Sequence, residues 1–298
     1  MPHKAKHHAW LGIVLLMLAG LCFATLDTIS KHVTTSISVL MAVWGRYFVQ
    51  AVLTTAVVLP IKGWAVLKTN NPRQHIGRGV LLVTVTALVF SCLQFMPVGE
   101  FTAIGMTVPL IVTLLASRLL GEHVSVHRVW LVCGGFIGTL IIMRPSGQDL
   151  GWLLLFPLAF VVLNAAFQLI TSMMARTEDA MTTQFYTTWI GTAVVSLPLF
   201  WFWQPITDAQ VLLELGLMGL SGFAGHFLLI LAFERSPAGK LMPYMYMQIG
   251  FAMLGGWLVF DHVPDHVSLL GMGLIALCGI ASGFLNAYEK VGSPENER

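Results

Sequence analysis

Residues 121–127 read GEHVSVH, and residues 260–266 read FDHVPDH. Each stretch contains an acid, a histidine directly after it and a second histidine four residues later, and the copies lie 139 positions apart. Two histidines at this spacing lie on one face of a helix, as they do in many zinc sites. The repeat therefore has two explanations: a metal site, or a duplicated segment of the chain.

The composition of the chain indicates a membrane protein. Of its 298 residues, 56% are hydrophobic and only 10% are charged, whereas soluble proteins carry about 25% charged residues. The net charge of +2 leaves no basic surface that would favour nucleic acid as a partner. The four cysteines lie in apolar stretches and form neither a Cys-x-x-Cys motif nor a disulfide framework.

Ten segments are long and apolar enough to be transmembrane helices, since a span needs about 20 apolar residues. The first runs from Trp10 to about Val33, which is too long for the core of a signal peptide, and we interpret it as a mature helix. The links between segments are short and rich in Gly, Pro, Asn or charge, and the tail 291–298 is polar. The ten predicted spans are 10–32, 38–60, 78–97, 101–119, 126–143, 150–174, 181–203, 211–233, 241–260 and 267–287.

The distribution of Lys and Arg predicts the orientation of the chain in the membrane. If the N-terminus is cytoplasmic, only Lys31 and Arg144 fall on the outer side and Arg46 falls within a span. The rest of the sixteen Lys and Arg residues then fall on the inner side, as the positive-inside rule requires. We therefore predict a multi-pass protein of the cell (inner) membrane with both termini in the cytoplasm.

The opening repeat extends into the spans that follow it. The stretch 122–138 enters the fifth span and the stretch 261–277 enters the tenth, while FATLDTIS (23–30) resembles NAAFQLIT (164–171). This pattern predicts two five-helix halves, residues 1–145 and 146–298, and an odd number of helices inverts the second half in the membrane. The predicted fold is an all-α membrane protein with ten transmembrane helices in two inverted five-helix repeats and a substrate site between the halves.

This topology also decides between the two explanations of the repeat. The first copy faces the cytoplasm and the second faces outside, so a bilayer core of about 30 Å separates them and they cannot share a metal ion. We therefore interpret the repeat as the mark of an inverted duplication and expect no metal and no cofactor.

Several motifs, in their order and spacing, resemble the drug/metabolite transporter superfamily, EamA type, over nearly the whole chain. They are EFTAIGMTVPLIVTLLASRLLGEHVS (100–125), its weaker copy LMPYMYMQIGFAMLGGWLVFDHVP (241–264), LDTISKH (26–32) and WGRYF (44–48). The second copy lacks a proline at the position of Pro109, so the halves are not equivalent in function. The resemblance implies transport of small organic solutes, often as export and without ATP.

Charged residues within a membrane are costly and point to function. Asp27 and Arg46 both fall roughly 8–12 Å below the outer boundary, where they either pair to fix helix packing or bind a substrate or coupling ion. Lys31 lies one turn further out. Trp44 and Tyr47 flank Arg46 and either stack on an organic substrate or belong to the aromatic belt at the membrane surface.

Two further candidates lie in and before the fourth span. Glu100 precedes this span, where an acid complements the helix dipole or takes part in ion coupling. Pro109 lies in the middle of the span and cannot donate to the carbonyl of Gly105. The sequence therefore predicts a kink at Pro109, which either faces a substrate cavity or serves packing.

The candidates of the second half are neutral. Gln168, Tyr244 and Gln248 fall toward the inner half of their spans, where they line the pathway or hydrogen-bond between helices. His226 lies deep in a span and either carries a proton or is a core histidine.

These observations together predict a secondary transporter rather than an enzyme. The sequence contains no Gly-x-x-x-x-Gly-Lys-Ser/Thr motif and no Gly-x-Ser-x-Gly motif. The predicted function is alternating-access export of a small polar or amphipathic metabolite, with charges of both signs favouring an amino-acid-like zwitterion. Import of the same solutes and a membrane-embedded metalloenzyme are the alternatives. The expected partners are the solute, the lipid bilayer and a coupling proton carried by Asp27 or Glu100, and the chain is either a monomer or a homodimer.

Overall fold

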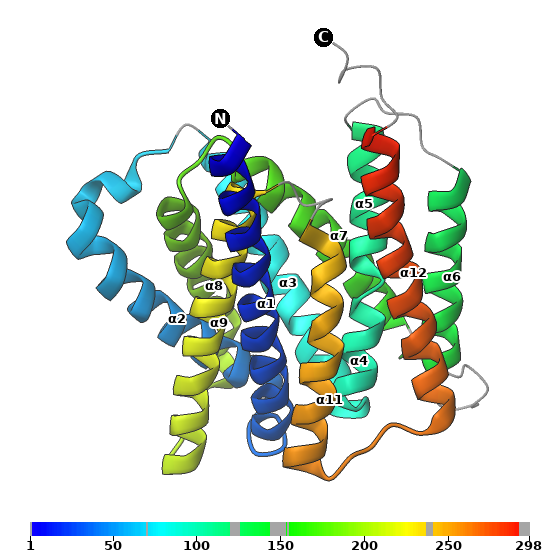
Figure 1. Cartoon of the computed structure of the whole chain (residues 1–298). Coiled ribbons are helices and arrows are strands. Elements are labelled where there is room, and N and C mark those ends of the chain that lie inside the picture. Colours follow the sequence, from blue (N-terminus) through cyan, green and yellow to red (C-terminus); the bar gives the residue numbers. More distant parts are fainter. Residues whose placement is uncertain are drawn as a thin grey trace.

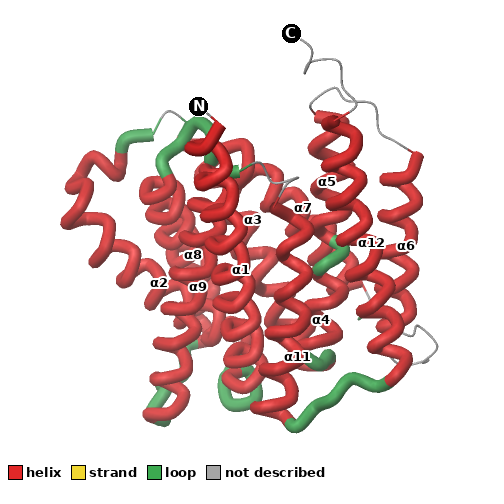
Figure 2. The backbone as a smooth tube through the Cα atoms, in the orientation of Figure 1, coloured by secondary structure: helices red, strands yellow, loops and turns green. Residues whose placement is uncertain are grey.

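The computed structural model describes residues 2–69, 71–119, 126–143, 153, 155–236 and 241–291, which form helices joined by short turns (Figure 1). Within these ranges no strand is present, as Figure 2 shows, and the all-α prediction is confirmed. The first half contains α1 (Pro2–Val33), α2 (Val39–Lys62), the 3₁₀-helix η1 (Gly63–Leu67), α3 (Pro72–Phe95), α4 (Val98–Gly105), α5 (Val108–Leu119) and α6 (Val126–Met143). The second half contains α7 (Leu155–Met174), α8 (Ala180–Phe202), α9 (Ala209–Arg235), the 3₁₀-helix η2 (Met242–Tyr246), α11 (Met247–Phe260) and α12 (His266–Val291).

Seven of the described helices are long and apolar enough to cross a membrane. Three shorter apolar helices accompany them, at Val98–Val112, Val129–Met143 and Tyr244–Phe260. The seven candidates support a multi-pass membrane protein, and the count of ten spans in two inverted repeats stays a prediction.

The helices pack as a bundle whose two ends are distinct. α1 packs along α9, α3 along α7, α2 along α8, and α6 along α12. The start of α1 and the end of α12 lie at the same end of the bundle, at the top of Figure 1, which we call the termini end. The loop 261–265 lies at the opposite end, at the bottom of the same view.

Glycines bring α6 and α12 close together within the chain. A Cβ atom added to Gly138 would lie 2.8 Å from the carbonyl oxygen of Gly271, and a Cβ on Gly271 would lie equally close to that of Gly138. Gly134 on α6 faces the side chain of Cys278 on α12. The small face of α6 therefore serves packing inside this chain, as small residues do between membrane helices.

The fourth predicted span is interrupted at its centre. α4 ends at Gly105 and α5 begins at Val108, so the break falls just before Pro109. The backbone N–H of Met106 donates to the carbonyls of Thr102 and Ala103, which tightens the last turn of α4. At the predicted kink the α-helix is thus interrupted for two residues, Met106 and Thr107. Irregular backbone at membrane depth is tolerated where it is buried or lines a cavity, and Met106 is buried.

The acids in the second copy of the repeat, FDHVPDH (260–266), lie at the end of α11 and before the start of α12. The acid and first histidine of the first copy, Glu122 and His123, lie outside the described residues. Asp261 in the second copy does not begin α12: it ends α11 in the left-handed conformation, with φ of 51°, and its N–H bonds to the carbonyl of Trp257. Asp265 accepts instead from the N–H of Ser268 in the first turn of α12. No group of three metal-ligating side chains occurs among the described residues.

Candidate functional site

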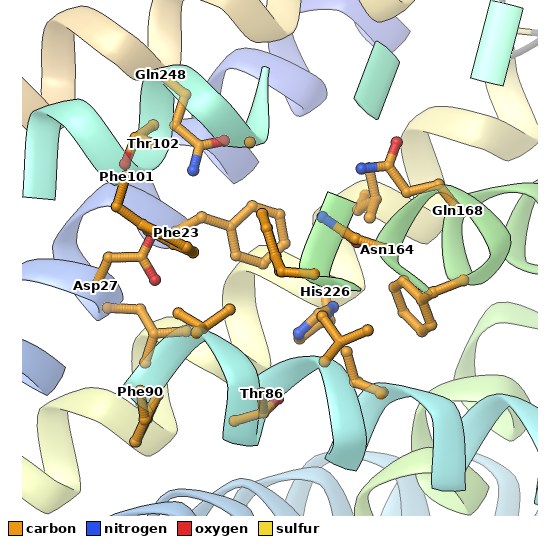
Figure 3. Close-up of a pocket in the computed structure, with 18 of the residues that line it drawn as sticks. Phe23, Asp27, Thr86, Phe90, Phe101, Thr102, Asn164, Gln168, His226 and Gln248 are labelled. Carbon is orange, nitrogen blue, oxygen red and sulfur yellow. The ribbon is translucent and has the colours of Figure 1, made fainter. Parts of the chain in front are cut away.

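A cavity lies in the middle of the bundle, between helices from both halves of the chain (Figure 3). Its polar lining comes from Asp27 on α1, Arg46 on α2, Thr86 on α3, Gln168 on α7 and His226 on α9, completed by the side chains of Thr102 on α4, Asn164 on α7 and Gln248 on α11. The empty space measures about 730 Å³, including the part open to solvent. The cavity therefore has room for several water molecules or a small organic group.

Arg46 is held in the cavity wall by neutral groups. Its side chain is buried, Nη1 donates to Oγ1 of Thr86 at 2.7 Å, and Nη2 donates to Nε2 of His226 at 3.0 Å. Nε has no partner. An arginine remains charged in proteins, so this wall carries a full positive charge that neither of its two hydrogen-bond partners neutralises.

The bond from Arg46 determines the protonation state of His226. A guanidinium has donors and no acceptor, so Nε2 of His226 must accept and cannot carry a proton. The neutral ring then carries its proton on Nδ1, which is buried without a hydrogen-bond partner. The rings of Phe23 and Phe167 pack edge to face with the imidazole, with centroids at 4.9 and 5.9 Å. His226 therefore offers the cavity one unused N–H donor.

Asp27 faces the same cavity. Its side chain is buried, and Figure 3 shows the carboxylate pointing toward the centre of the space. Among the described residues its oxygens have no hydrogen-bond donor, and no ion pair joins Asp27 to Arg46 within 4.0 Å. Of the two arrangements that the sequence left open, the two residues line one space jointly rather than pair.

Amides and aromatic rings complete the wall. Gln168 is buried with an unpartnered Oε1, and Gln248 extends its amide into the cavity from the opposite side in Figure 3. The apolar part of the lining combines aliphatic side chains and two methionines with five aromatic rings, those of Phe23, Phe90, Phe101, Phe160 and Phe167. Such a wall can stack on a flat or aliphatic group while the polar atoms orient it.

Tyr47, Trp44 and Lys31 lie outside the cavity. Tyr47 is fully buried, and its hydroxyl lies 3.2 Å from Oγ1 of Thr86, the residue that accepts from Arg46. Trp44 donates to Oγ of Ser196 at 2.9 Å. Lys31 donates to the carbonyls that end α3, those of Leu93 at 2.7 Å and Met96 at 2.8 Å.

Glu100 and Tyr244 also lie away from the lining. Glu100 lies in the first turn of α4 and its Oε1 is 2.9 Å from Nε2 of His262, in the loop at the end of the bundle opposite the termini. Tyr244 lies on η2 with 39% of its surface exposed. Pro109 follows the helix break, whose residues Gly105 and Met106 do line the cavity.

Thr86 in the site and Arg78 beyond it carried little signal in the sequence. Thr86 accepts from Arg46 and shares a hydrogen bond with the hydroxyl of Tyr47, but a single threonine in an apolar helix is common. Arg78 was counted with the inner loops because the third span was predicted to begin there. The helix begins at Pro72, which places Arg78 inside the bundle with no exposed surface.

Comparison with known proteins identifies related transporters. The chain is 27% identical to an S-adenosylmethionine uptake transporter of Rickettsia bellii, over 89% of this chain and 90% of that protein. It is 29% identical to a riboflavin transporter of Rhizobium johnstonii, over 90% and 89%, and 25% identical to the pseudopaline exporter CntI of Pseudomonas aeruginosa, over 91% and 95%. A crystal structure of a protein with 18% identity has the same fold, with a TM-score of 0.68 over 96% of this chain and 99% of the other.

These relatives are transporters and not enzymes, as the sequence predicted. Residues 10–144 match the EamA-like transporter family. The chain thus carries an EamA-like transporter domain in its first half, which confirms its relationship to EamA-type drug/metabolite transporters.

Proposed function

We propose that this protein is a secondary transporter that exports a small zwitterionic or amphipathic organic solute by alternating access. One observation carries the solute class: the cavity holds an unpaired carboxylate, Asp27, and a guanidinium, Arg46, whose hydrogen-bond partners are neutral. A solute with a cationic group for Asp27 and an anionic group for Arg46 would compensate both charges. Compensation of buried charges is a strong source of both affinity and selectivity.

The packing of the helices supports two inverted repeats. α1 packs on α9 and α7 packs on α3, which is the same relation with the halves exchanged. Likewise, α2 packs on α9 and α8 packs on α3. The pairs α2 with α8 and α6 with α12 join equivalent helices across the proposed symmetry axis. Ten passes with the termini at one end fit this arrangement, and we propose the inner membrane with cytoplasmic termini as their setting.

Matching interruptions in the two halves support the location of the site. Met106 lies at the break between α4 and α5, and Met245 lies in the 3₁₀-helix before α11. The two methionines are 139 positions apart, the same separation as in the repeat GEHVSVH and FDHVPDH, and both line the cavity. Broken helices at corresponding positions are typical of the substrate sites of transporters with inverted repeats.

The relatives suggest which solutes to test first. S-adenosylmethionine and riboflavin are the solutes named for two of them. The first carries an amino-acid group with charges of both signs, which suits Asp27 and Arg46, whereas riboflavin would rely on the aromatic wall.

Transport by the purified chain in proteoliposomes tests the proposal. The probes are S-adenosylmethionine, riboflavin and a neutral amino acid, and the variants are Asp27→Asn and Arg46→Ala. Glu214→Gln is the matched control, because Glu214 bonds to His32 at 3.0 Å and does not line the cavity. We expect transport of at least one probe to fall about tenfold or more in both cavity variants, since loss of a charge-assisted bond costs roughly 1.5–3 kcal/mol.

If both variants fold and transport at the rate of the wild type, the assigned site is wrong. Counterflow in right-side-out and inverted vesicles separates export from import. A proton gradient applied across the same vesicles tests coupling to protons, with Asp27→Asn and Glu100→Gln compared with the wild type.

A further inference from the structure

Arg78 occupies an unusual position between α3, α7 and α8. It is fully buried, its Nε donates to Oγ1 of Thr171 at 2.9 Å, and its Nη1 donates to Oγ1 of Thr187. The guanidinium also lies over the ring of Phe167, with its carbon 4.8 Å from the centroid. Its Nη2 has no partner.

The partners of Arg78 bring no negative charge. The hydroxyls of Thr171 and Thr187 each donate to a carbonyl of their own helix at 2.7 Å, so toward Arg78 they act only as neutral acceptors. No carboxylate of the described residues lies within 4.0 Å of the guanidinium. A buried ion without a counter-ion is strongly unfavourable, so the packing around Arg78 is not explained by stability.

Glu178, which lies beside His75 of the helix that carries Arg78, is engaged elsewhere. Glu178 accepts from Nδ2 of Asn71 at 2.9 Å and from Oγ1 of Thr69 at 3.1 Å, and it lies 3.5 Å from Nε2 of His75. His75 is one helical turn before Arg78 on α3. Within the described part of the chain, the contacts of Glu178 are therefore to the loop and to His75 rather than to the guanidinium.

Arg78 lies beyond the cavity in the direction of the termini end. Thr86, which holds Arg46, is eight residues further along α3, or about 12 Å at 1.5 Å per residue. Phe167 lies between the two sites: it lines the cavity, meets His226 edge to face, and covers Arg78 with its ring. Phe167 therefore contacts both the cavity and the guanidinium of Arg78.

We propose that Arg78 is a second binding site for the anionic group of the transported solute, a carboxylate or a phosphate, on the termini side of the cavity. This inference rests on the proposed function, because it assigns to the same solute a step between the cavity and the termini end. The anionic group of the solute passes between Arg46 and Arg78, in either direction of transport. The side chain of Phe167 lies between the two positions. The two unpaired guanidiniums are then successive sites on one path.

Anion binding by the purified full chain in nanodiscs tests this without any transport measurement. The probes are sodium acetate, sodium phosphate and sodium chloride at constant ionic strength, and the readout is the melting temperature as a function of anion concentration. Arg46→Met leaves Arg78 as the remaining site, so this variant is compared with the double variant Arg46→Met, Arg78→Met. We expect acetate or phosphate to bind the single variant at least tenfold more tightly than the double variant.

The melting temperature without added anion gives a second readout. Since Arg78 is an uncompensated charge, Arg78→Met should melt at the temperature of the wild type or above it, whereas a residue that serves packing would lower it. If Arg46→Met does not fold, wild type and Arg78→Met are compared with the same probes. Arg46 remains in both proteins, so at saturating anion the melting temperature of the wild type, which keeps both sites, should rise further than that of Arg78→Met. Arg78→Lys, which keeps the charge without the fork of donors, should retain part of the anion response.

Equal anion affinity with and without Arg78, or a response to chloride alone, would overturn the proposal. The second outcome would assign the site to an inorganic ion instead of the solute. Failure of the proposed function has a different signature, because it is judged by transport in the Asp27→Asn and Arg46→Ala variants and not by the anion response of Arg78.

Discussion

Substitution of His226 by Asn and by Gln separates its two roles in the cavity. The side chain of Gln is long enough to place an acceptor where Nε2 of His226 accepts from Arg46, at 3.0 Å in the wild type. The shorter side chain of Asn reaches the position of Nδ1, the donor that has no protein partner. Each variant therefore retains one function of the imidazole and loses the other.

The structure predicts opposite effects on stability and binding. In His226→Asn the buried Nη2 of Arg46 loses its acceptor, and a bond from a charged donor contributes roughly 1.5–3 kcal/mol to the free energy of unfolding. In His226→Gln this bond is retained, so stability should stay within about 1 kcal/mol of the wild type. The affinity for the solute should fall roughly three- to tenfold in Gln, because a neutral hydrogen bond contributes about 0.5–1.5 kcal/mol, and should be retained in Asn.

Unfolding of the purified protein in mixed micelles measures the first effect, and ligand-induced thermal shift with the transported probe measures the second. His32→Asn is the control, because His32 bonds to Glu214 at the end of the bundle with 41% of its side chain exposed and should change stability little. The reasoning fails if Gln destabilises the protein as much as Asn does. It fails equally if Asn is as stable as the wild type, since Nε2 would then not be the acceptor that Arg46 requires.

Two further predictions concern packing and pH. Gly279→Ala should destabilise the protein by about 1–3 kcal/mol or more in a melting assay, since its Cβ would overlap the ring of Tyr246. Gly273→Ala on the same helix is the control, because a Cβ there meets nothing within 4 Å. An equal loss of stability in Gly273→Ala would exclude the steric explanation. Burial raises the pKa of Glu178, but the hydrogen bonds from Asn71 and other donors outweigh it and hold the pKa below its usual 4.5. The Glu178 carboxylate therefore stabilises the fold at neutral pH, and this stabilisation is lost as the pH falls below 4.5 toward the folded pKa. Glu178→Gln should remove that part of the pH dependence of the melting temperature. An unchanged pH profile in the variant would contradict the assignment.

The fold was predictable to the extent that hydrophobic runs report helices. The predicted spans agree with the described helices within a few residues at most ends, but two differences mattered. Charge in the loop moved the predicted start of the third span to Arg78, although Pro72 is suited to the first turn of a helix and begins α3. The break at Met106 and Thr107 was predicted as a kink at Pro109 because a proline marks where a hydrogen bond is missing, while tertiary packing decides which neighbouring turn opens.

The sequence predicted which polar residues lie within spans, but not which of their side chains point into the cavity. Asp27, Arg46, Gln168, His226 and Gln248 were singled out as polar groups within spans, and all of them line one cavity. A sequence does not record which helix faces another, so Lys31 and Glu100 were placed in the same class. In the structure their long side chains reach backbone carbonyls and a histidine at the end of the bundle, where a helix end leaves unpaired groups to satisfy.

The balance of charge in the core argues that it is built for a ligand. A bundle selected for stability alone would pair its buried ions or replace them by apolar side chains, since an ion without a counter-charge weakens the fold. Asp27 and Arg46 line one cavity without forming an ion pair, and Arg46 bonds to neutral acceptors. Arg78 on α3 also bonds to neutral acceptors. Asp27 has no hydrogen-bond donor among the described residues, and one nitrogen of each guanidinium has no partner. Such uncompensated polar groups within a membrane protein point to function. A solute carrying both charges is the component that would complete this core, and its affinity should therefore appear directly as added stability of the folded protein.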